Sequence, residues 1–262
     1  SGDVKGDVAE QTQQTPKKPS KKLTKEQREE IYKLEKQRRE EKKIRVEELA
    51  EKLEKKIQSL ITASGNQQDL DRFNAELNKE IEDLKMESFG LELLHTIGKI
   101  YHTKASAFLK SQKTFGISKI FSSVKQKGST AKSAWNILST AMDAQASMEK
   151  MIKAQEKGEE WDEYQKAEFE RTMTGKFVAT AWMSSKFEIQ GVLRDVCDKI
   201  LNNKEISSKE RTSKAQALLL IGNQFIKAER SVDEDEEVRL FEDLMYEATA
   251  KKNSKKDQLK SK

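Results

Sequence analysis

The chain has 262 residues, of which 36% are charged and 35% hydrophobic, with 50 Lys and Arg against 45 Asp and Glu. This length allows one or two domains with a real core. The single cysteine, Cys197, excludes an intramolecular disulfide, and no secretory signal or long apolar run is found, so we expect a reducing compartment, cytoplasmic or nuclear. An abundance of Lys, Glu, Gln, Leu and Ala, with both prolines before residue 20, predicts an all-α protein.

Residues 1–22 are polar and hold both prolines, which predicts a disordered lead-in. Thr24 and Gln27 then form a capping-box pattern that opens a charged helix over residues 23–64. Because its apolar positions give no heptad seam before Val46, we expect this helix to protrude, solvated, and to join the bundle near residue 46. The poor seam favours a monomer, with a helical oligomerisation scaffold as an alternative.

Residues 65–250 are expected to form a bundle of about five helices, followed by a basic, frayed tail over residues 251–262. Ser207 and Ser231 each begin a further capping-box pattern. Apolar residues recur at helical spacing over 70–108, 120–152, 161–201, 208–225 and 232–248.

Signals of catalysis are weak. His95 and His102 are seven residues apart and share one helix face, but no carboxylate lies between residues 93 and 142 to complete a local metal site. The glycines are scattered singly, so no phosphate-binding loop is present. We therefore predict neither an enzyme nor a cofactor or metal.

One window departs from the even mixture of charges. Leu93 to Met142 is a run of fifty residues without Asp or Glu, whereas residues 229–247 carry nine acids. Phe115 and Phe121 are candidate aromatic contacts within this basic window. Its candidate recognition face consists of eight lysines: Lys99, Lys104, Lys110, Lys113, Lys119, Lys125, Lys127 and Lys132.

Three interpretations of the basic window remain open. The acidic segment can pack beside it and offset its charge, or the lysines can face acidic or unfolded segments of client and precursor proteins. Alternatively they face an anionic membrane. Four lysines in one plane contribute about 4 kcal/mol there, which is only about millimolar affinity, so Phe115 or Phe121 would have to insert. The low arginine and glycine content argues against nucleic acid.

Three stretches together resemble a known family. Phe89 to Ala105, the segment from Phe115 to Trp135, and Leu193 to Phe225 are similar to the opening, middle and closing signatures of the X domain (DnaJ-X) of DnaJ-type co-chaperones. The charged segment from Leu23 to Glu29 resembles the fungal cytosolic members. The signature positions, which we expect to be structural, are Phe89, Gly90, Leu94, His95, Gly98, Tyr101, Trp182, Cys197 and Gly222.

The resemblance implies a client-recognition and targeting domain of a J-protein, linked to delivery of proteins for organelle import, peroxisomes included. Members of the family stimulate a DnaK-type chaperone through a His-Pro-Asp motif in a separate J domain. Neither Pro16 nor Pro19 follows a histidine, so we expect this chain, which begins Ser1-Gly2 and resembles a fragment, not to stimulate that ATPase alone. Its last residues are not a peroxisomal address, so we expect work from the cytosol, or at the periphery of an organelle or plasma membrane.

Overall fold

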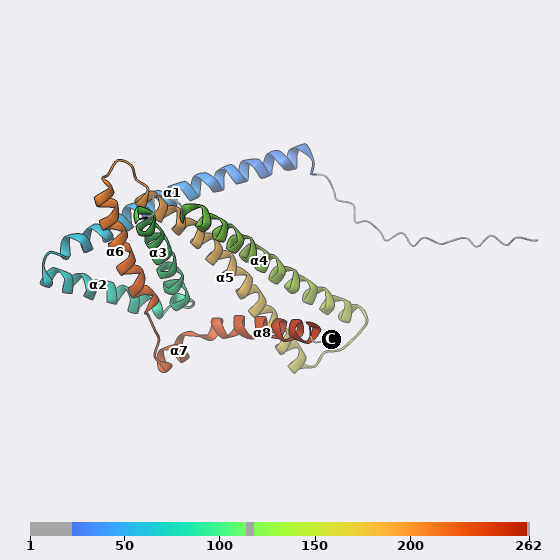
Figure 1. Ribbon diagram of the computed structural model, residues 1–262. Coiled ribbons are helices and arrows are strands. Elements are labelled where there is room, and N and C mark those ends of the chain that lie inside the picture. Colours follow the sequence, from blue (N-terminus) through green and yellow to red (C-terminus); the bar gives the residue numbers. More distant parts are fainter. Residues whose placement is uncertain (1–22, 114–117, 261–262) are drawn as a thin grey trace, which may run out of the picture. The chain divides into compact units, whose positions relative to one another are not determined.

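The computed structural model describes the backbone of residues 23–113 and 118–260, and the side chains of residues 23–112 and 132–250. The described residues are helical with no strand (Figure 1), which confirms the all-α class. The helices are α1 (Lys25–Ala63), α2 (Gln67–Lys85), α3 (Gly90–Lys113), α4 (Ser118–Glu156), α5 (Glu163–Leu201), α6 (Ser208–Ile226), α7 (Val232–Val238) and α8 (Leu240–Lys260).

The described residues form eight helices, more than the number expected, because two apolar runs that look continuous in the sequence are broken. The first break lies between α2 and α3, where the backbone of Phe89 takes φ 61°. The second lies at Arg239, which caps α7 with φ −84° and ψ 7°. Neither break carries a proline. The capping boxes predicted at Ser207 and Ser231 are both formed.

The chain divides into two units, residues 1–41 and 42–262, and the division falls inside α1. In the described part of the first unit every residue is exposed. Its helix is held by local bonds: the Gln27 amide N–H donates to Thr24 Oγ1 at 3.1 Å, and Arg39 pairs with Glu35 one turn away at 3.2 Å. Such pairs contribute about 0.3–0.5 kcal/mol each, as expected for a solvated, charge-rich helix.

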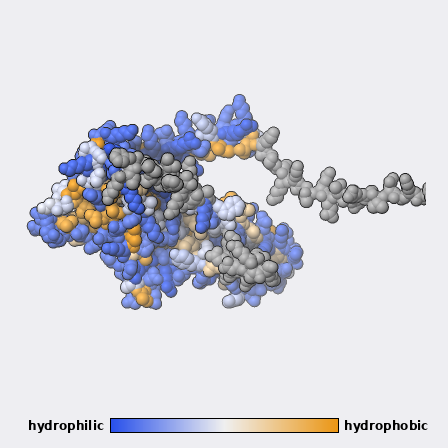
Figure 2. Space-filling view, in the orientation of Figure 1, coloured by the Kyte–Doolittle hydropathy of each residue, from blue (hydrophilic) through white to orange (hydrophobic). Residues whose placement is uncertain are grey.

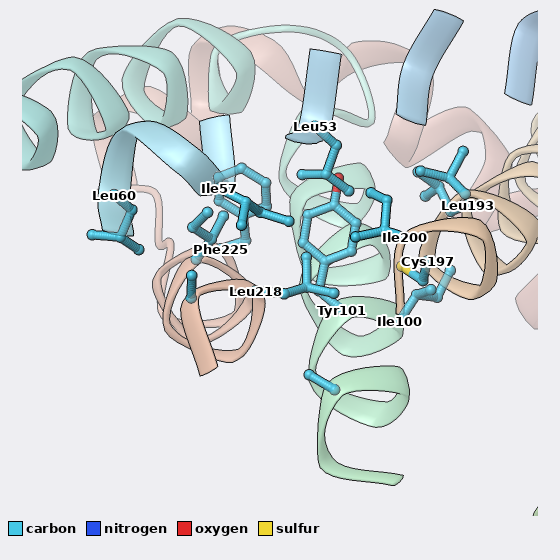
Figure 3. Packing of buried hydrophobic residues seen from close by; sticks show 14 of the residues in the cluster. Leu53, Ile57, Leu60, Ile100, Tyr101, Leu193, Cys197, Ile200, Leu218 and Phe225 are labelled. Atoms are coloured by element: carbon cyan, nitrogen blue, oxygen red, sulfur yellow. The ribbon is translucent and has the colours of Figure 1, made fainter. Parts of the chain in front are cut away.

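The core of the second unit forms where the end of α1 meets α2, α3, α5 and α6. Figure 3 shows Leu53 and Ile57 of α1 lying against Tyr101, Leu218 and Phe225. Ile57 and Leu218 are wholly buried, and burial of such a side chain contributes about 1.5–3 kcal/mol.

Helix α5 packs against α3, α4, α6 and α8. The surface seen in Figure 2 is mainly hydrophilic, with separate apolar patches. None of the described helices is long and apolar enough to cross a membrane.

Candidate functional site

The most exposed apolar surface of α4 is a row of five large side chains. Their exposed fractions range from 38% to 67%. We call them the α4 stripe: Trp135, Leu138, Met142, Met148 and Ile152.

The opposite face of α4 is the one that packs against α5. Thr140 and Ala144 are buried there, and their small side chains let the two helices approach closely. The Lys176 ammonium of α5 lies 3.0 Å from the Asp143 carboxylate and donates to Ser147 Oγ at 2.7 Å. These contacts fix the rotation of α4, and the α4 stripe therefore faces solvent.

A groove of about 890 Å³ lies at the end of the α4–α5 hairpin. Its apolar lining consists of three methionines and three aromatic rings, and the rings of Trp161 and Phe169 meet edge to face at 5.4 Å between centroids. Met148 belongs both to the α4 stripe and to this hairpin groove. The six apolar residues are Met148, Met151, Trp161, Phe169, Met173 and Phe177.

Sequence reasoning missed the hairpin groove. A signal was available, because three of the seven methionines of the chain, together with Trp161 and Phe169, fall between residues 148 and 173. Residues from two helices and the loop between them contribute to the groove. A periodicity analysis that takes one helix at a time does not combine them.

The lysines of the basic window do not all face outward. Lys104 of α3 pairs with Asp198 of α5 at 2.8 Å, and its side chain is only 19% exposed. Lys99, Lys110 and Lys132 are exposed. The other predicted members of this face lie outside the described side chains: Lys113, Lys119, Lys125, Lys127, Phe115 and Phe121.

Within the described residues, the acidic segment (residues 229–247) packs mainly through α8 against α5. Carboxylates of this segment form ion pairs: Glu234 pairs with Lys85 at 3.1 Å and Glu247 with Arg171 at 2.9 Å. Two contacts lower the pKa of Glu234: the hydrogen bond from the Ser231 backbone N–H has the larger effect, and the contact with Lys85 adds to it.

Two signature glycines form the closest approach between α3 and α6. A methyl group built on Gly98 would lie 2.6 Å from the carbonyl oxygen of Gly222, and one built on Gly222 would lie 2.9 Å from Tyr101 Cβ. Nearby, the ring of Tyr101 packs on Phe225 with centroids 6.2 Å apart. Only glycine permits this backbone contact, so the pair serves the packing of α3 against α6.

Phe89 and Gly90, the signature residues at the break between α2 and α3, form a second structural cluster. Phe89 stacks on Trp182 at 4.7 Å between ring centroids, and its backbone N–H donates to Glu242 Oε1 at 2.6 Å. The backbone of Phe89 is in the left-handed region, which costs a non-glycine residue about 1–3 kcal/mol. The ring stacking and the hydrogen bond offset this cost. Gly90 follows because a Cβ there would lie 1.8 Å from the carbonyl oxygen of Leu84.

A buried arginine joins this cluster to α8. The Arg230 side chain is 2% exposed and lies 3.0 Å from Glu242 Oε2. Its Nε also donates to the carbonyl oxygen of Lys85 at 2.6 Å, and its Nη2 to that of Glu87 at 2.9 Å. The two carbonyl acceptors lie at the break between α2 and α3, and the carboxylate acceptor lies at the start of α8. Arg230 therefore holds these two regions together.

The remaining signature residues are also structural. Leu94 and Cys197 are fully buried, and His95 Nε2–H donates to the carbonyl oxygen of Ala228 at 2.8 Å. Trp182 Nε1 donates to Glu92 at 2.9 Å. Burial raises the pKa of the Cys197 thiol to about 12, and a thiol that stays protonated is a poor nucleophile.

Within the described ranges, no group of three or more His, Cys, Asp or Glu side chains is arranged to hold a metal ion. The α4 stripe and the hairpin groove offer apolar contact, with charged side chains on either side.

A family model described as the X-domain of DnaJ-containing proteins (DnaJ-X) matches residues 42–245. The chain belongs to the DnaJ-X family. Protein CAJ1 of Saccharomyces cerevisiae is 46% identical over 234 residues, which are 89% of this chain and 59% of CAJ1. DnaJ-like protein 1 of the same yeast is 37% identical over 226 residues, 81% of this chain and 52% of that protein. No solved structure matches the chain.

An uncharacterized J domain-containing protein of Schizosaccharomyces pombe is 36% identical over 227 residues, 86% of this chain and 57% of that protein. The chain is thus the DnaJ-X domain of a fungal J-protein and spans between half and three fifths of these relatives. The matched domain is one found in J-protein co-chaperones.

Proposed function

We propose that this DnaJ-X domain is the non-catalytic client-recognition and targeting part of its J-protein. The observation that carries the proposal is the exposure of the α4 stripe, whose members are 38–67% exposed on a helix fixed by the Asp143–Lys176 ion pair. Contiguous exposed apolar side chains mark interaction surfaces. A partly unfolded client offers apolar segments that cover such a row.

The methionines of the surface support a variable rather than a unique partner. Met142 and Met148 lie in the α4 stripe, and unbranched, polarisable methionine side chains adapt to differently shaped partners. We place this recognition in the cytosol, in delivery of precursor proteins for organelle import, peroxisomal import included. A DnaK-type chaperone would be engaged through a J domain of the whole protein, and the domain itself would act as a monomer.

Suppression of aggregation tests the proposal. The purified chain, without any chaperone ATPase, is added to an unfolded protein diluted from denaturant, and light scattering is followed. We expect suppression at stoichiometric ratios, and loss of most of it in a variant with Leu138→Ser and Met142→Ser. The matched control is Leu220→Ser, since Leu220 is 58% exposed on α6, close to the 52% of Leu138.

Absence of suppression at a stoichiometric excess would contradict client recognition. Equal loss in the Leu220→Ser control would show instead that general surface hydrophobicity is responsible. Circular dichroism of each variant verifies that its helices are retained, because substitutions of exposed side chains should change stability by only about 0.5 kcal/mol.

An anionic membrane surface is the second candidate, favoured by the acid-free window and by the exposed Lys99, Lys110 and Lys132. Flotation with liposomes that contain or lack an anionic lipid tests it. Binding by the lysines requires the anionic lipid and is abolished when Lys110, Lys113, Lys119 and Lys125 are all changed to Glu. Binding that survives this change would contradict the lysine mechanism.

A further inference from the structure

The hairpin groove combines an adaptable lining with a definite size. Three methionines and three aromatic side chains line a space of about 890 Å³, which lies within the roughly 300–1,000 Å³ typical of ligand pockets. Such a space accepts several large apolar side chains from one segment. Methionine thioethers adjust to the shape of what enters and also contact aromatic rings favourably.

The rim of the hairpin groove is acidic. Glu159 and Glu160 lie on the loop and Glu170 on α5, and all three are exposed. In the part of the chain that the structure describes, no ion pair involves these three carboxylates, whereas the rim cation Lys166 lies 3.8 Å from Glu163. The local charge is therefore opposite to that of the chain as a whole, which carries a net +5.

The two ends of the α4 surface thus differ in charge. The half of α4 before Asp143 belongs to the acid-free window, while the hairpin end presents Glu159, Glu160 and Glu170. Charge at the edge of an apolar contact selects the partner and fixes its register more than it adds affinity. A groove lined by two helices with an apolar floor is also the setting in which an amphipathic helix binds by its apolar face.

We propose that the hairpin groove binds a basic amphipathic segment of a client polypeptide. Large apolar side chains at helical spacing enter between Met151, Trp161 and Phe177, and lysines or arginines on the flanks of the segment lie against the rim carboxylates. This inference rests on the proposed client recognition and names the class of segment recognised. It differs from the acidic segments that the lysine-rich window alone suggests.

Fluorescence anisotropy with labelled peptides tests the proposal on the full chain. The first, the Leu/Lys peptide, carries Leu at helical spacing with Lys on the remaining face. The second, the Leu/Glu peptide, replaces every Lys by Glu, and the third has the residues of the first in scrambled order. We expect the Leu/Lys peptide to bind most tightly and its affinity to fall with salt. Because the chain carries a net charge of +5, its overall electrostatics favours the acidic peptide. A preference for the Leu/Lys peptide would therefore identify the acidic rim of the groove as the cause.

Two variants separate the charged from the apolar contribution. Changing Glu159, Glu160 and Glu170 to Lys should weaken binding of the Leu/Lys peptide by about tenfold or more at low salt. Phe177→Ser should weaken binding of the Leu/Lys and Leu/Glu peptides alike, since Phe177 is 55% exposed and supplies apolar contact without supporting the core. The matched charge control changes three exposed acids elsewhere, Glu76, Glu87 and Glu205, to Lys, and should leave binding within about twofold.

Equal binding of the Leu/Lys and Leu/Glu peptides, or binding that the rim reversal leaves unchanged, would overturn the proposal. If the chain suppresses aggregation through Leu138 and Met142 yet binds no Leu/Lys peptide, the hairpin groove proposal fails and client recognition stands. If the peptide binds at the rim but aggregation is not suppressed, client recognition fails and the groove remains a peptide site.

Discussion

Substitution of Gly98 by Ala tests how closely α3 and α6 must approach. The added methyl group would lie 2.6 Å from the carbonyl oxygen of Gly222 and 2.9 Å from the backbone N of Ile226. Both neighbours are backbone atoms, so rotation of the Ile226 side chain, whose Cγ1 also lies 2.9 Å away, relieves neither contact. Bringing the first contact to 3.4 Å requires the helices to separate by roughly 0.8 Å in an interior packed at crystal-like density.

The expected free energy follows from two opposing effects. Ala favours a helix over Gly by about 0.8–1 kcal/mol, while overpacking of a core costs about 1–3 kcal/mol. Since the clash is with backbone, we take the upper part of that range and expect Gly98→Ala to lower the free energy of unfolding by about 1–2 kcal/mol. For a chain of this size that corresponds to roughly 2–8 °C in Tm.

Gly191→Ala is the matched control. Gly191 lies inside α5, and the nearest atom to its added methyl group is the flexible Lys42 Nζ at 3.8 Å. The same change in helix propensity therefore acts without a clash, and stability should rise by up to about 1 kcal/mol. Urea denaturation followed by circular dichroism measures both variants. If Gly98→Ala is as stable as Gly191→Ala, the close crossing of α3 and α6 is wrong.

Three further predictions follow from buried groups. Arg230→Met should cost about 3–5 kcal/mol of unfolding free energy in urea titrations, because Glu242 is left buried without its partner; an unchanged midpoint would contradict that role. Lys176→Met should increase amide hydrogen exchange in α4 between residues 136 and 147, where the ion pair to Asp143 is lost, but leave α6 unchanged. The pKa of the Cys197 thiol rises on folding from its ordinary value near 9.0 to about 12. The contribution of this thiol to the free energy of unfolding is therefore complete below pH 9 and declines as pH rises, by about 1.4 kcal/mol per pH unit. Stability should therefore fall between about pH 9 and pH 10, and less steeply in Cys197→Ala.

Local rules predicted the helix starts that depend on a few neighbouring residues. Thr24, Ser207 and Ser231 each cap a helix with the residue three positions later, and this signal is contained within four residues. The break at Phe89 could not be predicted in that way. It is held by Glu242 and Arg230, which are distant in the sequence, so tertiary contacts outweigh the helical spacing of the surrounding apolar residues.

The side of a helix that packs against a neighbour is the second feature that could not be predicted from the sequence. The spacing of Trp135, Leu138 and Met142 correctly predicted a helix, but their row faces solvent because the smaller Thr140 and Ala144 pack against α5. Periodicity identifies an apolar face without naming its partner. The hairpin groove needs α4, α5 and their loop together, and a pairing of helices is not contained in the period of either one.

Site-specific photo-crosslinking tests the client-binding surface most directly. A photoreactive amino acid is placed at Leu138 in the α4 stripe, or at Leu220 on α6, which is similarly exposed, and each protein is irradiated with an unfolded client. We predict crosslinks from position 138 that excess unlabelled client competes away, and little from position 220. Equal crosslinking from both positions, or none from position 138 while aggregation is suppressed, would contradict the assignment of α4 as the client-binding helix.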